Sequence, residues 1–371
     1  MKWPRPIWPG DFTTVDATEN APDLRVFRSN LGGDTIHCRE LHLSFATSAN
    51  SKAFHCPHAG NPAAGICRDV LIQGYTPYEW LRDGATTKHR LAYCNVAGGE
   101  KVADCQSGGI TTATLATALS VLPPTIEILF LSGNEITSLG ADAFGNLAAM
   151  TKIKAVYLND CKLATVDVNA LRGLSNLEIF NADENLVVDL HADFLKNTPK
   201  LRQFAMFHNY NLWSTTNKIP TTFFSHTPNL EVISLYGTAV SSFEKDTFKG
   251  LTKLTLLTFV TNANIASFPQ GCFDDLVSLK FFDFFRCNIS TIPEGFFGPW
   301  AKNIIRIAFW NNPIASVHPK AGLENLHSIE QAYFHYGSNE PGSPATFDIV
   351  PVAKALLKIN PMITLTYGQT Q

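Results

Sequence analysis

The sequence predicts an α/β repeat solenoid, a horseshoe with a parallel β-sheet on its concave face and short irregular or helical segments on its convex face. One observation is a frame, L-x-x-L-x-L-x-x-N-x-L, which begins as IEILFLSGNEI at Ile126 and returns along most of the 371-residue chain. The second is its spacing, because the apolar residue at the sixth position recurs every 24 to 29 residues. A unit of this length cannot bury its apolar face alone, so neighbouring units must stack.

The frame returns as IKAVYLNDCKL, LEIFNADENLV, LEVISLYGTAV, LKFFDFFRCNI and IIRIAFWNNPI. Its sixth position is held by Leu131, Leu158, Ala182, Met206, Leu235, Phe259, Phe284, Phe309 and Phe334. Each such run alternates like a strand, and about nine strands are expected.

The ninth position is mostly Asn, and the chain must turn sharply there while its buried backbone groups find hydrogen-bond partners. An Asn amide supplies both a donor and an acceptor, so we expect these side chains to form a ladder along the solenoid. Cys161 and Cys287 occupy the same position and are expected to be buried ladder thiols rather than ligands or nucleophiles. The ninth-position residues are Asn134, Cys161, Asn185, Asn209, Thr238, Asn262, Cys287 and Asn312.

A second apolar set follows each strand, as in NIASFPQGCFDDL and NISTIPEGFFGPW. With these segments the sequence resembles extracellular leucine-rich-repeat proteins that have repeats of roughly 24 residues. CQSGGITTATLATALSVLPPTIEILFLSGNEI is similar to the Cys-containing N-terminal cap of those proteins, and the resemblance covers residues 94–340. It departs from them because no Cys follows Cys287, so the usual four-Cys C-terminal cap is absent. The recurring Phe residues are expected to fill the arc behind the strands, and they include Phe144, Phe194, Phe248, Phe273 and Phe296.

These features divide the chain into three parts. Residues 1–121 form a Cys-containing N-terminal cap region, and residues 122–340 form a solenoid of about nine repeats. Residues 341–371 form a C-terminal cap, because VPVAKALLKI has helical apolar spacing and MITLTYG alternates like a strand.

The charge and hydropathy of the sequence argue against binding to nucleic acid, binding to an anionic membrane and a membrane-spanning helix. The net charge is −3 and no run rich in Lys or Arg exists, so the electrostatic basis for binding nucleic acid or an anionic membrane is missing. No apolar stretch approaches about 18 residues, so no transmembrane helix is predicted. The first residues, MKWPRPIWPGDF, do not predict a signal peptide because Pro and charged residues interrupt any apolar core.

Cysteines cluster before the repeats, where five of the eight are found. Such clustering in a cap indicates disulfides and an oxidising compartment, so we expect an extracellular or cell-surface protein. Local pairs Cys56–Cys67 and Cys94–Cys105 are the candidates, with Cys38 left over. The alternative is a zinc site in HCPHAGNPAAGIC, but the spacing of its His and Cys residues is not a standard zinc-finger pattern. We favour disulfides and expect neither a metal nor a cofactor.

Side chains on the concave face are the candidate ligand contacts. In this frame the second, third, fifth, seventh and eighth residues point out of the core, because strand side chains alternate. Contiguous exposed aromatic surface marks an interaction site. The alternative is that a frame shift, or the insertion around Trp213–Lys218, buries some of these residues. The candidates are Tyr157, Asp183, Phe207, Tyr236, Phe285, Arg286, Trp310, Tyr333 and His335.

The sequence therefore predicts a non-catalytic recognition module that binds a protein, peptide or glycan on the concave face. The motifs G-x-S-x-G, H-E-x-x-H and Gly-rich phosphate loops are absent from the sequence, so no catalytic residue is predicted. One alternative is a structural protein of an extracellular coat or matrix that self-associates, and a more distant one is an intracellular scaffold. The single sequon, Asn288-Ile289-Ser290, is the candidate glycosylation site.

Overall fold

The computed structural model describes residues 89–97, 99–144, 151–260, 265, 268–309, 311–334 and 349–366. The chain divides into two compact units, residues 1–78 and 79–371, and every described residue belongs to the second. The predicted division at residues 121 and 340 stays a prediction.

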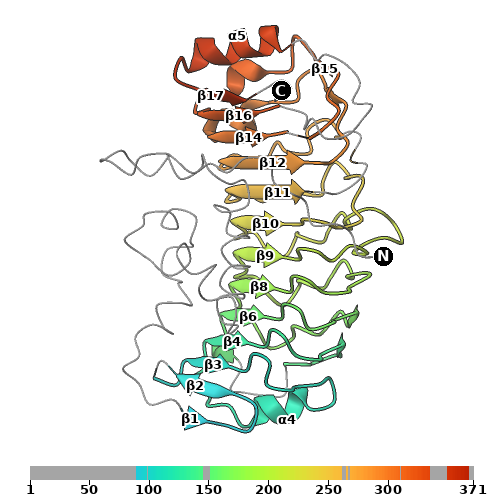
Figure 1. Ribbon diagram of the computed structural model, residues 1–371, viewed down its shortest axis with the longest axis vertical. Helices are drawn as coiled ribbons and strands as arrows, with labels where there is room; N and C mark the ends of the chain where they lie inside the picture. The colour runs from blue at the N-terminus through green and yellow to red at the C-terminus, as the bar shows by residue number, and fades with distance from the viewer. Residues whose placement is uncertain are drawn as a thin grey trace, which may run out of the picture. The chain divides into compact units, whose positions relative to one another are not determined.

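A 13-stranded sheet runs through this unit, with its strands stacked almost in chain order (Figure 1). The first three strands form an antiparallel meander, and every later neighbour pair is parallel. Each repeat supplies one strand that begins at the third position of its frame and ends at the fifth, or at the seventh in β11 and β12, so the predicted parallel β-solenoid is confirmed. The strands are β1 (His89–Arg90), β2 (Asn95–Ala97), β3 (Val102–Asp104), β4 (Ile128–Phe130), β6 (Ala155–Tyr157), β8 (Ile179–Asn181), β9 (Gln203–Ala205), β10 (Val232–Ser234), β11 (Leu256–Val260), β12 (Phe281–Phe285), β14 (Arg306–Ala308), β16 (Gln331–Tyr333) and β17 (Thr364–Thr366).

Helices are short and lie mainly at the two ends of the stack (Figure 1). The helix α4 (Leu115–Ser120) precedes the first repeat, and α5 (Val350–Ile359) lies between β16 and β17. Two 3₁₀ turns, η4 (Pro299–Asn303) and η5 (Leu323–Asn325), lie behind the last repeats. The convex side also carries the strand pairs β5 (Ser138–Leu139) with β7 (Thr165–Val166) and β13 (Thr291–Ile292) with β15 (Ser316–Val317). None of the helices in the described ranges has the length and apolar character needed to cross a membrane.

Phenylalanine rings fill the space between the strands and the convex side. Phe284 is fully buried, and its ring lies 5.2 Å from that of Phe259 and 5.1 Å from that of Phe268. Phe248 and Phe273 stack between consecutive repeats with centroids 5.8 Å apart. The predicted Phe column is therefore a continuous spine, which gives each repeat the apolar contacts that it cannot make alone.

The predicted ladder is present at the ninth position. The Asn185 Oδ1 accepts hydrogen bonds from the backbone N–H groups of Cys161 and Leu163 at 3.0 and 2.8 Å. Its Nδ2 donates to the carbonyls of Leu158 and Ala182 at 2.8 and 3.0 Å. It also donates to the Asp183 carbonyl at 3.0 Å, so one amide joins two repeats through five backbone groups. Asn134, Asn209 and Asn312 act in a similar way.

Cysteine at the ninth position supplies only part of this pattern. The Cys161 Sγ donates to the Leu131 carbonyl at 3.2 Å, and the Cys287 Sγ donates to the Phe259 carbonyl at 3.0 Å. Both thiols are fully buried, and burial raises the pKa of Cys161 to about 11. A thiol held in its neutral form is a weak nucleophile and a poor metal ligand, in agreement with a role in the ladder.

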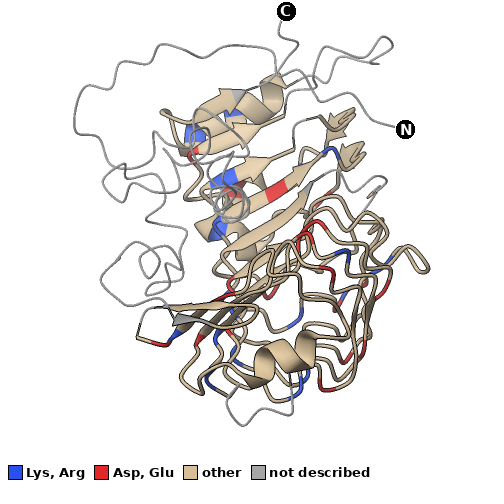
Figure 2. Ribbon diagram, turned by 60° about the horizontal axis from the view of Figure 1, so that its bottom comes forward, with Lys and Arg blue, Asp and Glu red and all other residues tan. Residues whose placement is uncertain are grey.

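From Glu127 to Glu231, acidic and basic side chains alternate between repeats at the second position, just before each strand. Glu127 lies between Lys101 at 3.1 Å and Lys154 at 2.8 Å, and Arg202 pairs with Glu231 at 2.9 Å. Partly exposed pairs of this kind contribute about 0 to 1 kcal/mol each. Figure 2 shows basic and acidic residues interspersed along the repeats.

The structure joins Cys94 to Cys105 by a disulfide, one of the two pairs expected from the sequence. Both residues are buried, and the bond ties the segment before β2 to the residue that follows β3. The expected Cys56–Cys67 pair and the zinc alternative lie outside the described residues.

We expect removal of this disulfide to lower the free energy of unfolding by about 2 to 3 kcal/mol, since the bond restricts a loop of about a dozen residues in the unfolded chain. The measurement is urea unfolding of the Cys94→Ser, Cys105→Ser double variant. In a Cys56→Ser, Cys67→Ser background, which removes the other expected pair, the protein with Cys94 and Cys105 intact should lose a similar amount when a reductant is added, and the double variant should not respond to the reductant. An unchanged midpoint in both cases would contradict a structural role for the bond.

Candidate binding surface at the strand ends

The concave side chains of the strands are nearly inaccessible. At the fifth position of the frame Asn181 is 0%, Ser234 1% and Thr258 5% exposed. The next residue along this row, Asp283, forms a buried ion pair with Arg306, whose Nε and Nη2 donate to the two carboxylate oxygens at 3.1 and 2.6 Å. Exposed side chains therefore have to be sought where the strands end.

The expectation that the seventh-position side chains stand exposed is wrong for Asp183 and Phe207. Asp183 is 0% exposed because its Oδ1 accepts a hydrogen bond from the Phe207 backbone N–H at 2.6 Å in the next repeat. Burial raises the pKa of this carboxyl to about 7. Phe207 is 6% exposed because its ring stacks on Tyr236 at 4.2 Å.

Two predicted tyrosines are also buried. Tyr157 is 6% exposed and stacks on Phe130 with centroids 4.8 Å apart. Tyr333 is 9% exposed, and its hydroxyl lies 3.4 Å from the Gln331 Oε1 on the same strand. In both cases a neighbour on the same face of the sheet covers the ring, so the expected exposure is wrong here as well.

Tyr236, Phe285 and Arg286 keep accessible surface. Tyr236 and Phe285 are half-buried, Arg286 is exposed, and the Arg286 guanidinium lies 5.2 Å from the centre of the Phe285 ring. A cation over an aromatic face is held in one orientation by the quadrupole of the ring. The remaining candidates, Trp310 and His335, lie outside the described residues.

Four rings from two repeats form one cluster at the ends of β9 and β10. His208 lies 3.8 Å from Phe207, 4.7 Å from Tyr236 and 5.1 Å from Tyr210 between ring centroids. Burial lowers the pKa of His208 to about 4, so the imidazole is neutral at physiological pH. The cluster therefore presents aromatic and neutral polar groups rather than a cation.

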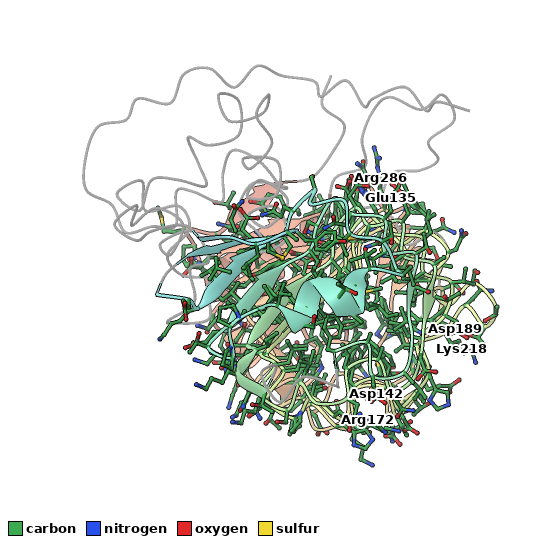
Figure 3. The ribbon with its side chains drawn as sticks, turned by 90° about the horizontal axis from the view of Figure 1, so that it is seen from below. Glu135, Asp142, Arg172, Asp189, Lys218 and Arg286 are labelled. Atoms are coloured by element: carbon green, nitrogen blue, oxygen red, sulfur yellow. A yellow bond between two sulfur atoms is a disulfide. The ribbon has the colours of Figure 1, made fainter. Side chains whose placement is uncertain are left out.

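The residue at the eighth position of the frame sets the direction in which the chain leaves each strand. The described non-glycine residues at this position, Asp160, Glu184, His208, Arg286 and Asn311, have φ between 52° and 55°, and Gly133 and Gly237 also have positive φ there. This left-handed backbone turns the chain out of the strand in the same way in successive repeats. Figure 3, which looks along the stack, shows Glu135 and Arg286 on the same flank although they belong to different repeats.

Sequence reasoning missed three exposed apolar residues in the loops that follow β8 and β9. Leu186, Val188 and Tyr210 are 58%, 39% and 62% exposed. Leu186 and Tyr210 hold the tenth position of the frame, where Glu135 and Lys162 stand in earlier repeats. The change from charged residues at this position in the first two repeats to Leu and Tyr in the next two is the sequence signal that could have found Leu186 and Tyr210.

Two models of known protein families match parts of this chain. A model described as "BspA type Leucine rich repeat region (6 copies)" matches residues 204–300, and a "Leucine Rich Repeat" model matches residues 125–147. The chain is a leucine-rich-repeat protein. Its Asn ladder, its parallel stack and the disulfide before its first repeat are the structural counterparts of that assignment.

Several known proteins are similar to this leucine-rich-repeat protein. The "Oplophorus-luciferin 2-monooxygenase non-catalytic subunit" of Oplophorus gracilirostris is 25% identical over 65% of this chain and 84% of its own length. Keratocan of Danio rerio is 27% identical over 57% of this chain, which spans 58% of that protein. The crystal structure of human 5T4, "Wnt-activated inhibitory factor 1, Trophoblast glycoprotein", has a TM-score of 0.47 at 16% identity and covers 69% of this chain and 83% of that one.

The sequon residue Asn288 is exposed and lies two residues after Arg286 on the same turn. Its φ is 58°, so the side chain leaves a left-handed turn rather than a strand. Glycosylation at Asn288 stays a prediction.

Proposed function

We propose that this leucine-rich-repeat protein is a non-catalytic recognition module that binds a partner protein at the strand ends, where Tyr236, Phe285 and Arg286 are accessible. The observation that carries the proposal is the ring cluster around Tyr236, because aromatic residues and Arg dominate the energetics of protein interfaces. Rings that already stack on one another lose little conformational freedom when a partner binds.

The chemistry of the same surface favours binding over catalysis. The imidazole of His208 has a pKa of about 4, so it is a weak base and lacks the acidic imidazolium proton near pH 7. The carboxyl of Asp183 is engaged by the Phe207 backbone N–H and is fully buried. Among known proteins, a relative matched over 84% of its length is by name a non-catalytic subunit, which supports a role beside another protein.

An extracellular or cell-surface location is part of the proposal. The Cys94–Cys105 disulfide supports it, because such bonds persist in oxidising compartments and are rare where thiols are kept reduced.

The test is affinity capture from an extract of the producing organism, quantified by mass spectrometry. We expect the Tyr236→Ala, Phe285→Ala double variant to retain less than about a tenth of the wild-type amount of a specific partner, since the anchoring rings are lost. Val277→Ser is the matched control, because Val277 is 40% exposed and lies behind β12. Circular dichroism verifies that all variants fold.

Equal capture by the wild type and the double variant would contradict binding at the strand ends. Sedimentation of the purified protein separates this function from self-assembly. Concentration-dependent association that the double variant leaves unchanged would favour a structural protein instead.

A further inference from the structure

Three exposed apolar side chains, Leu186, Val188 and Tyr210, form what we call the flank patch. They are 58%, 39% and 62% exposed, whereas the polar tenth-position residues Glu135 and Lys162 neutralise each other in an ion pair at 2.7 Å. Apolar side chains clustered on the surface and rimmed by polar groups mark sites of interaction with another protein.

The patch spans two consecutive repeats. Leu186 and Tyr210 occupy the same frame position in consecutive repeats, whose paired strands lie about 4.8 Å apart. The loops that carry them are tied together, since the Val187 N–H donates to the Asn209 Oδ1 at 3.2 Å and the Trp213 N–H donates to the Val188 carbonyl at 2.7 Å.

The Tyr210 ring is held in place before any partner binds. It stacks on His208 with centroids 5.1 Å apart and an interplanar angle of 21°. Its Cε1 also lies close to Gly237, where a Cβ atom would meet it at 3.1 Å. A large ring fixed by its neighbours is a preorganised anchor.

Negative charge borders the patch. Glu184 stands two residues before Leu186, and its backbone N–H donates to the Phe207 carbonyl of the next repeat at 2.6 Å. Asp160 holds the same eighth position one repeat earlier, and burial together with Asp160 raises the pKa of Glu184 above its ordinary value. No Lys or Arg in the described ranges forms an ion pair with Glu184 or Asp160, and Lys162, which lies near Asp160, pairs with Glu135 instead. A cation brought to this position would relieve the repulsion between the two carboxylates.

We infer that the flank patch and Glu184 bind a segment of the partner protein in which apolar side chains stand next to Lys or Arg. The inference rests on the proposed function and names the class of its partner. Charge complementarity selects this occupant, because an acidic segment would add repulsion at Glu184 and Asp160. An uncharged glycan would leave Glu184 without a counter-ion.

The test uses a phage-displayed library of random peptides selected on the folded protein. We expect the selected sequences to combine aliphatic or aromatic residues with Lys or Arg. The strongest peptide is then synthesised, and its affinity for each variant is measured by fluorescence anisotropy. Leu186→Ser and Tyr210→Ser are expected to weaken binding at least about tenfold, and Glu184→Gln to weaken it and reduce its salt dependence. Val277→Ser is the control and should bind like the wild type.

Selected peptides without basic residues, or no selection above that on the heat-unfolded protein, would overturn the inference. The inference would also be overturned by a peptide that still binds Leu186→Ser and Tyr210→Ser but no longer binds Phe285→Ala. That result would not contradict the proposed function. The proposed function itself fails only if capture of a natural partner is independent of the strand-end residues.

Discussion

Replacing Asn185 by Ala is expected to lower the free energy of unfolding by about 3 to 5 kcal/mol, because each buried group left without a partner costs about 1 to 3 kcal/mol and partial rearrangement limits the sum. The side chain satisfies the N–H groups of Cys161 and Leu163 and the carbonyls of Leu158 and Ala182, and it is 3% exposed. Urea unfolding measures this decrease in the free energy of unfolding. Hydrogen exchange at the Cys161 and Leu163 amides should locate it.

The ladder itself supplies the matched comparison. Asn185→Cys should cost less than Asn185→Ala, because the thiols of Cys161 and Cys287 donate to carbonyls in the same position. Cys161→Asn should be neutral or stabilising, since an amide there adds an acceptor that the thiol lacks. If Asn185→Ala and Asn185→Cys were equally stable and exchange at Leu163 stayed slow, the ladder would not be what joins these repeats.

The fold was predictable because every repeat gives the same information again. The positions of Leu131, Ala182 and Phe309 predict the strands, and the Asn residues three places later predict the turn and its hydrogen bonds. A repeat that stacks only on its neighbours leaves few alternatives to a parallel sheet.

Exposure at the candidate site was less predictable, because it depends on contacts between repeats that one frame does not describe. The alternation of a strand tells which face Tyr157 and Phe207 occupy, but Phe130 and Tyr236 then cover them. Asp183 is drawn inward by a backbone N–H of the next repeat, at a position where Ser and Asn stand in earlier ones. Such contacts depend on the loop conformation at the eighth position, which residue type alone does not specify.

Replacing Asp183 by Asn is expected to stabilise the protein increasingly as the pH rises from about 4 to about 7. The carboxyl has a pKa of about 7 in the folded protein and about 3.9 in an unfolded chain. Between these values the folded protein holds a proton that the unfolded chain has released, so stability falls by about 1.4 kcal/mol per pH unit. The contribution of the neutral carboxyl is fully present below about pH 4 and is lost as the pH rises through about 7.

His208 acts in the opposite direction over much of this range. Its pKa is about 4 in the folded protein and about 6.5 in the unfolded chain, so its contribution to stability rises with pH between these values. In the wild-type protein the two slopes offset each other up to about pH 6.5. The repulsion that Glu184 exerts on Asp183 adds to the effect of burial on the carboxyl and is removed by the same substitution.

The Asp183→Asn substitution keeps an acceptor for the Phe207 N–H without a charge, so the difference in unfolding free energy between this variant and the wild type isolates the titration. We expect it to grow by on the order of 4 kcal/mol between about pH 4 and pH 7 and to stay constant above that, as measured by urea unfolding at intervals of about one pH unit. His208→Asn is the companion variant, because Asn tolerates the left-handed backbone of that position and should expose the falling slope of Asp183 alone. A difference between Asp183→Asn and the wild type that does not change with pH would show that the buried carboxyl is charged throughout, in which case a cation or donor must compensate it and Asp183 would belong to a binding site after all.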